Sequence, residues 1–83
     1  MRLRRYIKED KSDRAYRAIM KNKKYKTVYD SAVQNMVDSN EKDWTGETLA
    51  YRYMPFAYGY ERLSEKEQDE IEKLAVQLGR HFG

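Results

Sequence analysis

The sequence contains no cysteine and only one proline, four glycines and one histidine among its 83 residues. Without cysteine the chain has neither disulfide bonds nor thiolate metal ligands, so a domain this small must be stabilised by its core or by a partner. It also has no apolar run close to the roughly 18 residues that a membrane-spanning helix requires. A secretory signal would need an apolar stretch after the basic amino terminus, and none follows it. We therefore expect a cytoplasmic protein without a membrane segment.

Side chains suited to catalysis are also scarce. The only histidine is His81, and no thiol is present to form a nucleophile–base pair with it. Five carboxylates gather within residues 65–72, but negative charge at that position is typical of the first turns of a helix. The glycines form no phosphate-binding loop, and no metal-ligand spacing occurs. We predict that the protein is not an enzyme and uses no metal or other cofactor.

What the chain does contain is typical of a small folded domain. Hydrophobic residues make up 40% of the sequence and aromatic residues 13%, which favours a packed core over disorder. The length corresponds to one domain, residues 1–83. Apolar residues recur at spacings of three and four, which is the helical period. The sequence therefore predicts an all-α domain of three or four short helices, with residues 1–11 as a basic arm.

Two helices are predicted in the first half of the chain. Ser12 is a suitable N-cap for a helix over residues 12–24, and Thr27 for a second helix over residues 27–39. The second helix has the most regular amphipathic pattern in the sequence. Its predicted inward residues are Val28, Tyr29, Ala32, Val33, Met36 and Val37.

Residues 47–62 are predicted to form a broken helix that supplies most of the aromatic core. Thr45 or Thr48 would cap it, and Gly46 would ease the turn into it. Pro55 interrupts the helix and disfavours helical geometry at the residue before it. A last helix is predicted over residues 65–79, where Ser64 and Glu67 have the spacing of a capping box. Its predicted inward residues are Ile71, Leu74, Ala75 and Leu78.

Charge is distributed unevenly along the chain. Residues 1–26 contain eleven Lys/Arg against three Asp/Glu, a net charge of +8, and residues 27–83 contain six against eleven, a net charge of −5. Such asymmetry favours a polyanionic partner, with internal neutralisation as the alternative. The candidate nucleic-acid-binding residues are Arg2, Arg4, Arg5, Arg14, Arg17, Lys21, Lys23, Lys24 and Lys26, of which Arg14, Arg17, Lys21 and Lys24 share one helical stripe.

RNA is the favoured polyanion, because Tyr6, Tyr16 and Tyr25 are interleaved with these cations. Aromatic rings among cations suit the stacking of unpaired bases. The alternative for each tyrosine is packing in or beside the core. A small DNA-binding regulator is a further alternative, although no basic recognition helix follows a tight turn.

A protein partner is the other predicted class of ligand. Tryptophan, tyrosine and arginine are enriched at the energetic centres of interfaces. The candidate protein-binding residues are Trp44, Arg52, Tyr53, Tyr58 and Tyr60. A protein that binds only another protein, as an inhibitor or adaptor, is therefore an alternative to an RNA-associated one. For Trp44, packing over the edge of the core with its N–H at the surface is the alternative to an interface role.

The segments Arg-Leu-Arg-Arg-Tyr-Ile-Lys-Glu (residues 2–9) and Lys-Asn-Lys-Lys-Tyr-Lys (residues 21–26), with the small size and the lack of cysteine, resemble small accessory proteins of T-even-type bacteriophages. Within that group the chain is similar to basic phage antitoxins that inhibit the ToxN endoribonuclease with RNA in the complex. The resemblance covers the general character of the chain and assigns no role to any residue. It implies a counter-defence protein that holds RNA and blocks a host toxin in the host cytoplasm.

Overall fold

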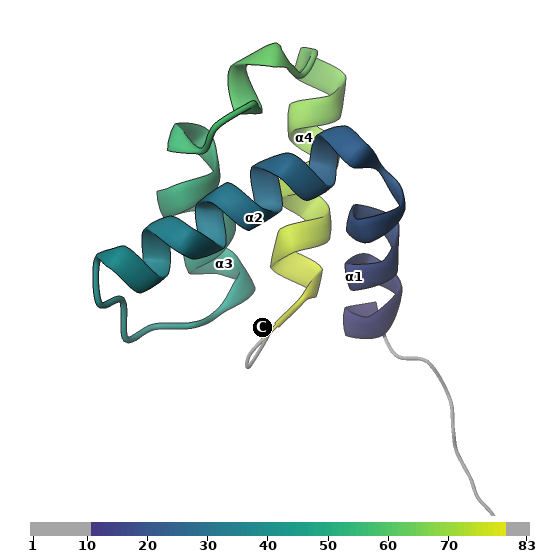
Figure 1. Ribbon diagram of the computed structural model, residues 1–83. Coiled ribbons are helices and arrows are strands. Elements are labelled where there is room, and N and C mark those ends of the chain that lie inside the picture. The colour runs from purple at the N-terminus through teal and green to yellow at the C-terminus, as the bar shows by residue number, and fades with distance from the viewer. Residues whose placement is uncertain (1–10, 80–83) are drawn as a thin grey trace, which may run out of the picture.

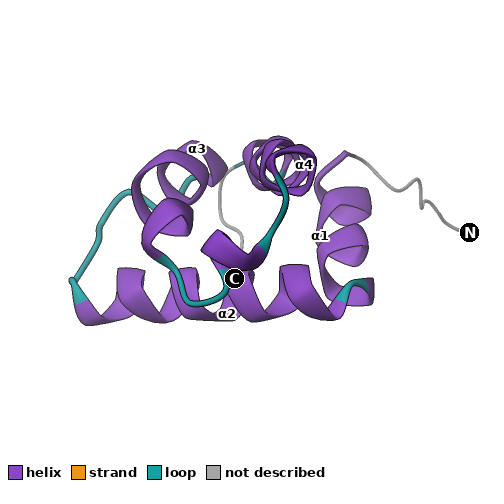
Figure 2. Ribbon diagram, turned by 90° about the horizontal axis from the view of Figure 1, so that it is seen from above, coloured by secondary structure: helices purple, strands orange, loops and turns teal. Residues whose placement is uncertain are grey.

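Helix α2 lies along one side of the molecule, and α1, α4 and the α3 region lie beside one another on its other side (Figure 1 and Figure 2). This arrangement comes from a computed structural model, which describes residues 11–79. No β-strand occurs in these residues, so the predicted all-α class is confirmed for them. The elements are α1 (Lys11–Lys21), α2 (Lys23–Asp38), α3 (Gly46–Thr48), the π-helical turn η1 (Leu49–Tyr53), the 3₁₀ turns η2 (Met54–Phe56) and η3 (Tyr60–Arg62), and α4 (Glu65–Gln77).

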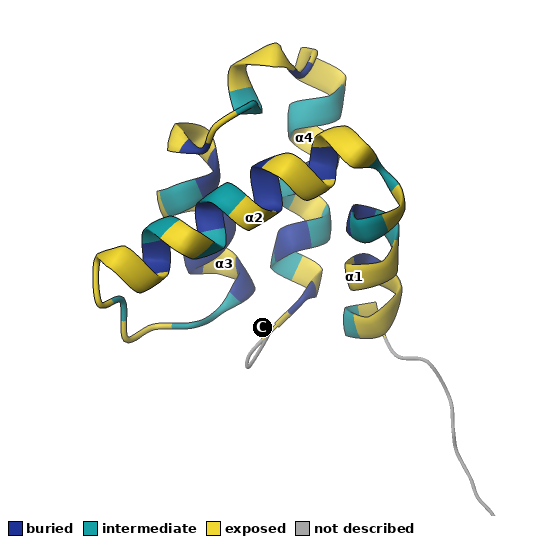
Figure 3. Ribbon diagram, viewed as in Figure 1, coloured by how far each residue is buried: buried dark blue, intermediate teal, exposed yellow. Residues whose placement is uncertain are grey.

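The core lies between α2 and the elements that pack on it (Figure 3). Aliphatic residues and methionines supply its largest fully buried side chains, which are Ile19, Val28, Met36, Leu49, Met54, Ile71 and Leu78. Burying each such side chain contributes roughly 1.5–3 kcal/mol relative to exposing it. The inward stripe predicted for the second helix is confirmed at Val28, Tyr29, Ala32 and Met36, whereas Val37 is exposed.

The chain turns from α1 into α2 within a single residue, Asn22. Its side-chain oxygen accepts hydrogen bonds from the backbone N–H groups of Lys24 (3.0 Å) and Tyr25 (3.3 Å), so Asn22 is the N-cap of α2. The predicted start at Thr27 is therefore wrong, because Thr27 lies inside α2 and its hydroxyl donates to the carbonyl of Lys23. Ser12 likewise lies within α1, and its hydroxyl donates to the Leu78 carbonyl at 3.0 Å.

The aromatic core predicted for residues 47–62 is not found. In this segment the buried side chains are Leu49, Ala50, Met54 and Ala57, together with Thr48 and Leu63 at its edges. The aromatic side chains between them point outward or lie at the boundary of the core. The reason is positional: Leu49, Ala50 and Met54 lie on the inward face of the turn, and Tyr51 lies on another face. Tyr53 and Tyr60 reach the core only at its edge.

Pro55 interrupts this segment as predicted, but the residue before it remains helical. The Met54 N–H donates to the Leu49 carbonyl, five residues back, which closes the wider π-helical turn. Met54 has φ −58° and ψ −41°, although a following proline disfavours that geometry. Its side chain is fully buried, and we attribute the conformation to this burial.

Helix α4 begins as the sequence predicts. The Ser64 hydroxyl accepts a hydrogen bond from the Glu67 N–H at 3.2 Å, and the Glu67 carboxylate accepts one from the Ser64 N–H at 2.9 Å. Both halves of the capping box are therefore present. Ile71, Ala75 and Leu78 are buried, as predicted.

Three tyrosine hydroxyls donate short hydrogen bonds to glutamate side chains that are distant in sequence. Tyr25 bonds Glu70 at 2.6 Å, Tyr60 bonds Glu72 at 2.7 Å, and Tyr53 bonds Glu41 at 2.6 Å. The first two join α4 to α2 and to η3. Hydrogen bonds to ionised acceptors are stronger than bonds between neutral groups. Tyr25 and Tyr60 therefore fasten α4, and Tyr53 fastens η1 to the loop after α2.

These contacts predict a loss of stability in alkaline solution. Burial, and then the bond to Glu70, raises the pKa of Tyr25 well above its usual 10.0, and burial raises the pKa of Tyr60 to about 12. A group whose pKa is raised by folding stabilises the native state fully below its unfolded pKa and loses that contribution as the pH rises through the folded pKa. We therefore expect the midpoint of thermal unfolding to fall above about pH 10, measured by circular dichroism.

The variant Tyr25→Phe isolates one of these groups. Its loss of the bond to Glu70 should cost about 1–2 kcal/mol near neutral pH and flatten the alkaline decline. Tyr51→Phe is the matched control, because Tyr51 is exposed and its hydroxyl makes no hydrogen bond to another residue within 11–79. An alkaline profile identical in Tyr25→Phe and wild type would contradict the assignment.

Candidate functional site

Helix α1 exposes a cationic side, which we call the α1 basic face: Arg14, Arg17 and Lys21. All three side chains are exposed, and their spacings of three and four residues place them on one side of the helix. The opposite side carries Ala15 and Ile19, which are buried in the core. Arg14 and Lys21 make no ion pair within the part of the chain that the structure describes. Arg14 and Lys21 therefore present positive charge to solvent that no ion pair within residues 11–79 compensates.

The stripe predicted to continue from Lys21 to Lys24 ends at the turn between the helices. Lys24 lies on α2, and its Nζ is 3.1 Å from a carboxylate oxygen of Glu67 on α4. The pKa of Glu67 is lowered by the hydrogen bond from the Ser64 N–H and then by Lys24, so Glu67 is ionised at neutral pH. Lys24 is thus compensated by the acidic last helix.

The remaining predicted cations also differ in whether they form an ion pair with an acidic side chain. Lys26 pairs with Asp30 one turn along α2, with 2.9 Å between Nζ and Oδ2. Lys23 is exposed at the start of α2 and makes no ion pair within residues 11–79. Exposed pairs contribute little to stability, but they cancel charge locally. Arg2, Arg4 and Arg5 lie outside the described residues.

The tyrosines interleaved with these cations have structural contacts. Tyr25 is buried and bonded to Glu70. Tyr16 is partly exposed and packs edge-to-face on Tyr29, with ring centroids 6.0 Å apart and planes at 81°. The structure therefore places Tyr25 in the core and Tyr16 at its boundary. Tyr6 is outside the described residues.

Three of the predicted protein-binding residues gather around Glu41. The Trp44 indole N–H donates to the Glu41 carbonyl at 2.7 Å, the Tyr53 hydroxyl bonds its carboxylate, and an Arg52 nitrogen lies 3.7 Å from the same carboxylate. The bond from Tyr53 and the N–H of Asp43 lower the pKa of Glu41. Trp44 packs partly buried against the core, as its structural interpretation predicts. Tyr60 is bonded to Glu72, so it too has an internal role.

Of the three most exposed aromatic residues, the sequence predicts only Tyr58 as a protein-binding residue. Phe56 is 81% exposed, Tyr58 63% and Tyr51 61%. Phe56 has no polar group with which to interact with water, so its exposure is the more unusual. A sequence signal exists for Tyr51, which lies off the inward stripe of Leu49, Ala50 and Met54 at the helical period. It does not exist for Phe56, which comes seven residues after Leu49.

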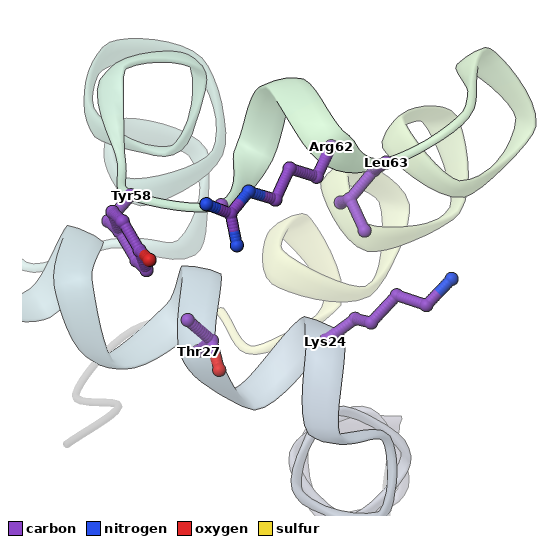
Figure 4. A pocket seen from close by; sticks show the side chains of 6 residues that line it. Lys24, Thr27, Tyr58, Arg62 and Leu63 are labelled. Carbon is purple, nitrogen blue, oxygen red and sulfur yellow. The ribbon is translucent and has the colours of Figure 1, made fainter.

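A pocket of about 290 Å³ lies between the start of α2 and the segment that precedes α4. The Arg62 guanidinium carbon is 5.2 Å from the centroid of the Tyr58 ring, within the range of a cation–π interaction. Figure 4 shows Arg62 reaching between Tyr58 and Leu63, above Thr27. Lys24, Thr27, Tyr58, Gly59, Arg62 and Leu63 line this space, which we call the Tyr58 pocket.

Two further kinds of feature are not found in residues 11–79. No group of three or more His, Asp or Glu side chains there is arranged to hold a metal ion. No helix in that range is both long and apolar enough to cross a membrane. His81 lies outside the described residues.

Comparisons with known proteins assign no family. No protein-family model matches the chain. Searches of curated proteins and of solved structures also found no match. Any functional conclusion therefore depends on the surfaces described above.

Proposed function

We propose that this is a non-enzymatic binding protein that holds single-stranded RNA on the α1 basic face and inhibits a protein partner. The observation that carries the proposal is the exposed cationic side of α1, on which Arg14 and Lys21 have no internal counter-charge within residues 11–79. Lysine and arginine side chains that neutralise phosphates release counterions, which drives binding to nucleic acid. The exposed Lys23 extends this cationic surface at the start of α2.

Internal ion pairs reduce the number of predicted nucleic-acid-binding residues that are available to a phosphate. Lys24 and Lys26 each have an acidic partner, so a phosphate would have to compete with Glu67 or Asp30 for them. Arg14 and Lys21 of the α1 basic face have the larger share of the proposed affinity for that reason. RNA is preferred over duplex DNA because two of the three lysines of α2, the helix that follows α1, are paired with acidic side chains. Within residues 11–79, α2 therefore does not present the basic surface with which a recognition helix enters a major groove.

Binding of a labelled single-stranded RNA, followed by fluorescence anisotropy over a range of salt concentrations, tests this half of the proposal. The logarithm of the association constant should fall linearly with the logarithm of the salt concentration, with a slope of about −0.7 for each phosphate contacted. Duplex DNA of equal length is the competitor. No measurable binding at low salt, or tighter binding to one duplex sequence, would contradict the RNA assignment.

The exposed aromatic residues support the second part of the proposal, which is that the protein binds and inhibits a protein partner. Phe56 and Tyr51 leave large aromatic rings in solvent, and such rings are characteristic of interface centres. An endoribonuclease toxin is the partner that the resemblance to phage antitoxins implies. We expect the protein to slow cleavage of an RNA substrate by a ToxN-type endoribonuclease, and Phe56→Ala to weaken inhibition by roughly 5-fold or more.

The control for this assay is Val37→Ala, which removes a different exposed apolar side chain. Equal inhibition by Phe56→Ala and the wild type would exclude Phe56 from the interface. Inhibition without any dependence on the α1 basic face would favour the alternative function, a protein-only inhibitor or adaptor.

A further inference from the structure

We infer that the Tyr58 pocket binds one nucleotide, with the base stacked against Tyr58 and Arg62 and the phosphate held chiefly by the Arg62 guanidinium. The inference deepens the proposed function, on which it rests, by naming a second contact for the same class of ligand. The volume of the Tyr58 pocket, about 290 Å³, is close to the lower end of the roughly 300–1,000 Å³ that is typical of small-molecule sites.

The wall of the pocket is suited to a planar aromatic ligand. Tyr58 and Arg62 already lie against each other at 5.2 Å, and both a phenol ring and a guanidinium plane stack on nucleobases. Leu63 adds an apolar surface on the other side of the same space (Figure 4). A base that enters the space between this pair and Leu63 would have the planar pair on one face and the aliphatic side chain on the other.

The charge of the pocket is suited to a phosphate. Arg62 makes no ion pair within the described part of the chain, so its guanidinium is free to bond an anion. Lys24, the second cation, shares its charge with Glu67. The guanidinium presents several donors in a fixed plane, which matches the oxygens of a phosphate. Arg62 is therefore the main phosphate ligand in this inference, and Lys24 adds to the attraction.

The backbone holds the pocket open. The Tyr58 N–H donates to the Ser31 hydroxyl at 2.9 Å, which fixes the loop to α2. Gly59 has φ +91°, a conformation that other residues rarely adopt, and its missing side chain leaves space above α2. A site whose walls are already in place loses less conformational entropy when the ligand binds.

The position of the pocket connects it to the α1 basic face. Lys21, at the end of α1, and Lys24, at the rim of the pocket, are separated only by the turn at Asn22 and the exposed Lys23. A single strand could therefore place phosphates along α1 and one base in the pocket. The same geometry would also accept a free nucleoside monophosphate, so the two sources must be separated by experiment.

The test is a nuclear magnetic resonance titration of the isotope-labelled full chain. A nucleoside monophosphate is added in one arm, a single-stranded RNA oligonucleotide in the second, and an abasic oligonucleotide in the third. We expect the backbone signals of residues 58–63 and of the first turns of α2 to shift with the RNA oligonucleotide. Tyr58→Ala should weaken that binding roughly 5- to 150-fold, which corresponds to the loss of one stacked base.

Tyr51→Ala is the matched control, because Tyr51 is the same residue type with nearly the same exposure but does not line the pocket. Equal effects of the two substitutions, or equal binding of the abasic and normal strands, would overturn the inference. Shifts of the pocket signals by the monophosphate, abolished in Arg62→Gln, would support the site with a free nucleotide as its source.

The two proposals fail in different ways. If RNA binds with the expected salt dependence while Tyr58→Ala has no effect, the pocket assignment is wrong and the α1 basic face remains. If the monophosphate fills the pocket while no strand binds at low salt, the pocket is correct and the proposed RNA function is wrong.

Discussion

Replacing Gly46 with alanine should lower the midpoint of thermal unfolding by more than about 12 °C, which corresponds to a loss of about 3 kcal/mol or more. A domain of this size is stabilised by roughly 4–12 kcal/mol in total. The substitution would therefore remove a large part of the stability, although it adds only one methyl group at the start of α3.

The cause is the close approach of α3 to the end of α4. A Cβ atom built on Gly46 would lie 2.0 Å from the carbonyl oxygen of Ala75, and 3.0 Å from the carbonyl carbon of Ala75 and the carbonyl oxygen of Val76. These are backbone atoms of α4, which cannot rotate away as a flexible side chain would. The Gly46 N–H also donates to the Gly79 carbonyl at 2.6 Å. To admit the methyl group, α3 and α4 must separate and lengthen that hydrogen bond.

Gly79→Ala provides the control for conformational strain alone. Gly79 has φ +70°, but nothing lies within 4 Å of a Cβ built on it. Its substitution should cost about 1–2 kcal/mol, the penalty of a left-handed conformation for a residue with a side chain. Circular dichroism melts of both variants measure the difference. A Gly46→Ala variant within about 1 kcal/mol of the wild type would show that the contact between α3 and α4 is loose.

Gly46 illustrates which features of the fold were accessible from the sequence. The sequence predicts that Gly46 eases the turn into a helix. In the structure Gly46 does not have a positive φ, and its role is to leave space for α4. Close approach between two helices is a property of their packing, and no local pattern encodes it. By contrast, the capping box of Ser64 and Glu67 is entirely local, and it was predicted correctly.

The prediction of an aromatic core in residues 47–62 is wrong for a related reason. Counting tyrosines measures the area available for burial, but the position of each residue on the turn decides which area is buried. The apolar stripe of Leu49, Ala50 and Met54 is present in the sequence and places Tyr51 on another face. Phe56 comes seven residues after Leu49, so the helical period alone would place it inward. What the sequence does not contain is the π-helical turn, because the fully buried Met54 stays helical next to Pro55.

The candidate site was predictable to the extent that it lies on one helix. Arg14, Arg17 and Lys21 follow from periodicity, since they are contained in α1. Lys24 does not continue the basic stripe of α1, because Asn22 follows the end of α1 and caps α2, which contains Lys24. The Tyr58 pocket joins residues as far apart as Lys24 and Arg62, which are 38 positions apart, and depends on tertiary packing. Sequence periodicity has no information at that distance.

Reversing the charge of the α1 basic face should weaken RNA binding by roughly 100-fold or more at about 0.1 M salt. Counterion release gives single strands a slope of about −0.7 for each phosphate contact, so the loss of three contacts changes the exponent by about 2. The variant is Arg14→Glu, Arg17→Glu, Lys21→Glu. Its salt dependence should become correspondingly shallower, because fewer counterions are released on binding. Lys21→Glu also places a negative charge at the end of α1, which costs about 0.3–1 kcal/mol of helix stability.

A second triple variant separates position from total charge. Lys42→Glu, Lys66→Glu and Lys73→Glu reverse three exposed cations that lie outside α1 and make no ion pair in residues 11–79. Both triples change the formal net charge from +3 to −3. If general electrostatic attraction governed binding, the two would weaken it equally. If the α1 basic face forms the phosphate contacts, only the first triple should reduce the salt slope, with circular dichroism showing intact helices in both. An equal loss in the two variants would remove the basis for assigning RNA to α1.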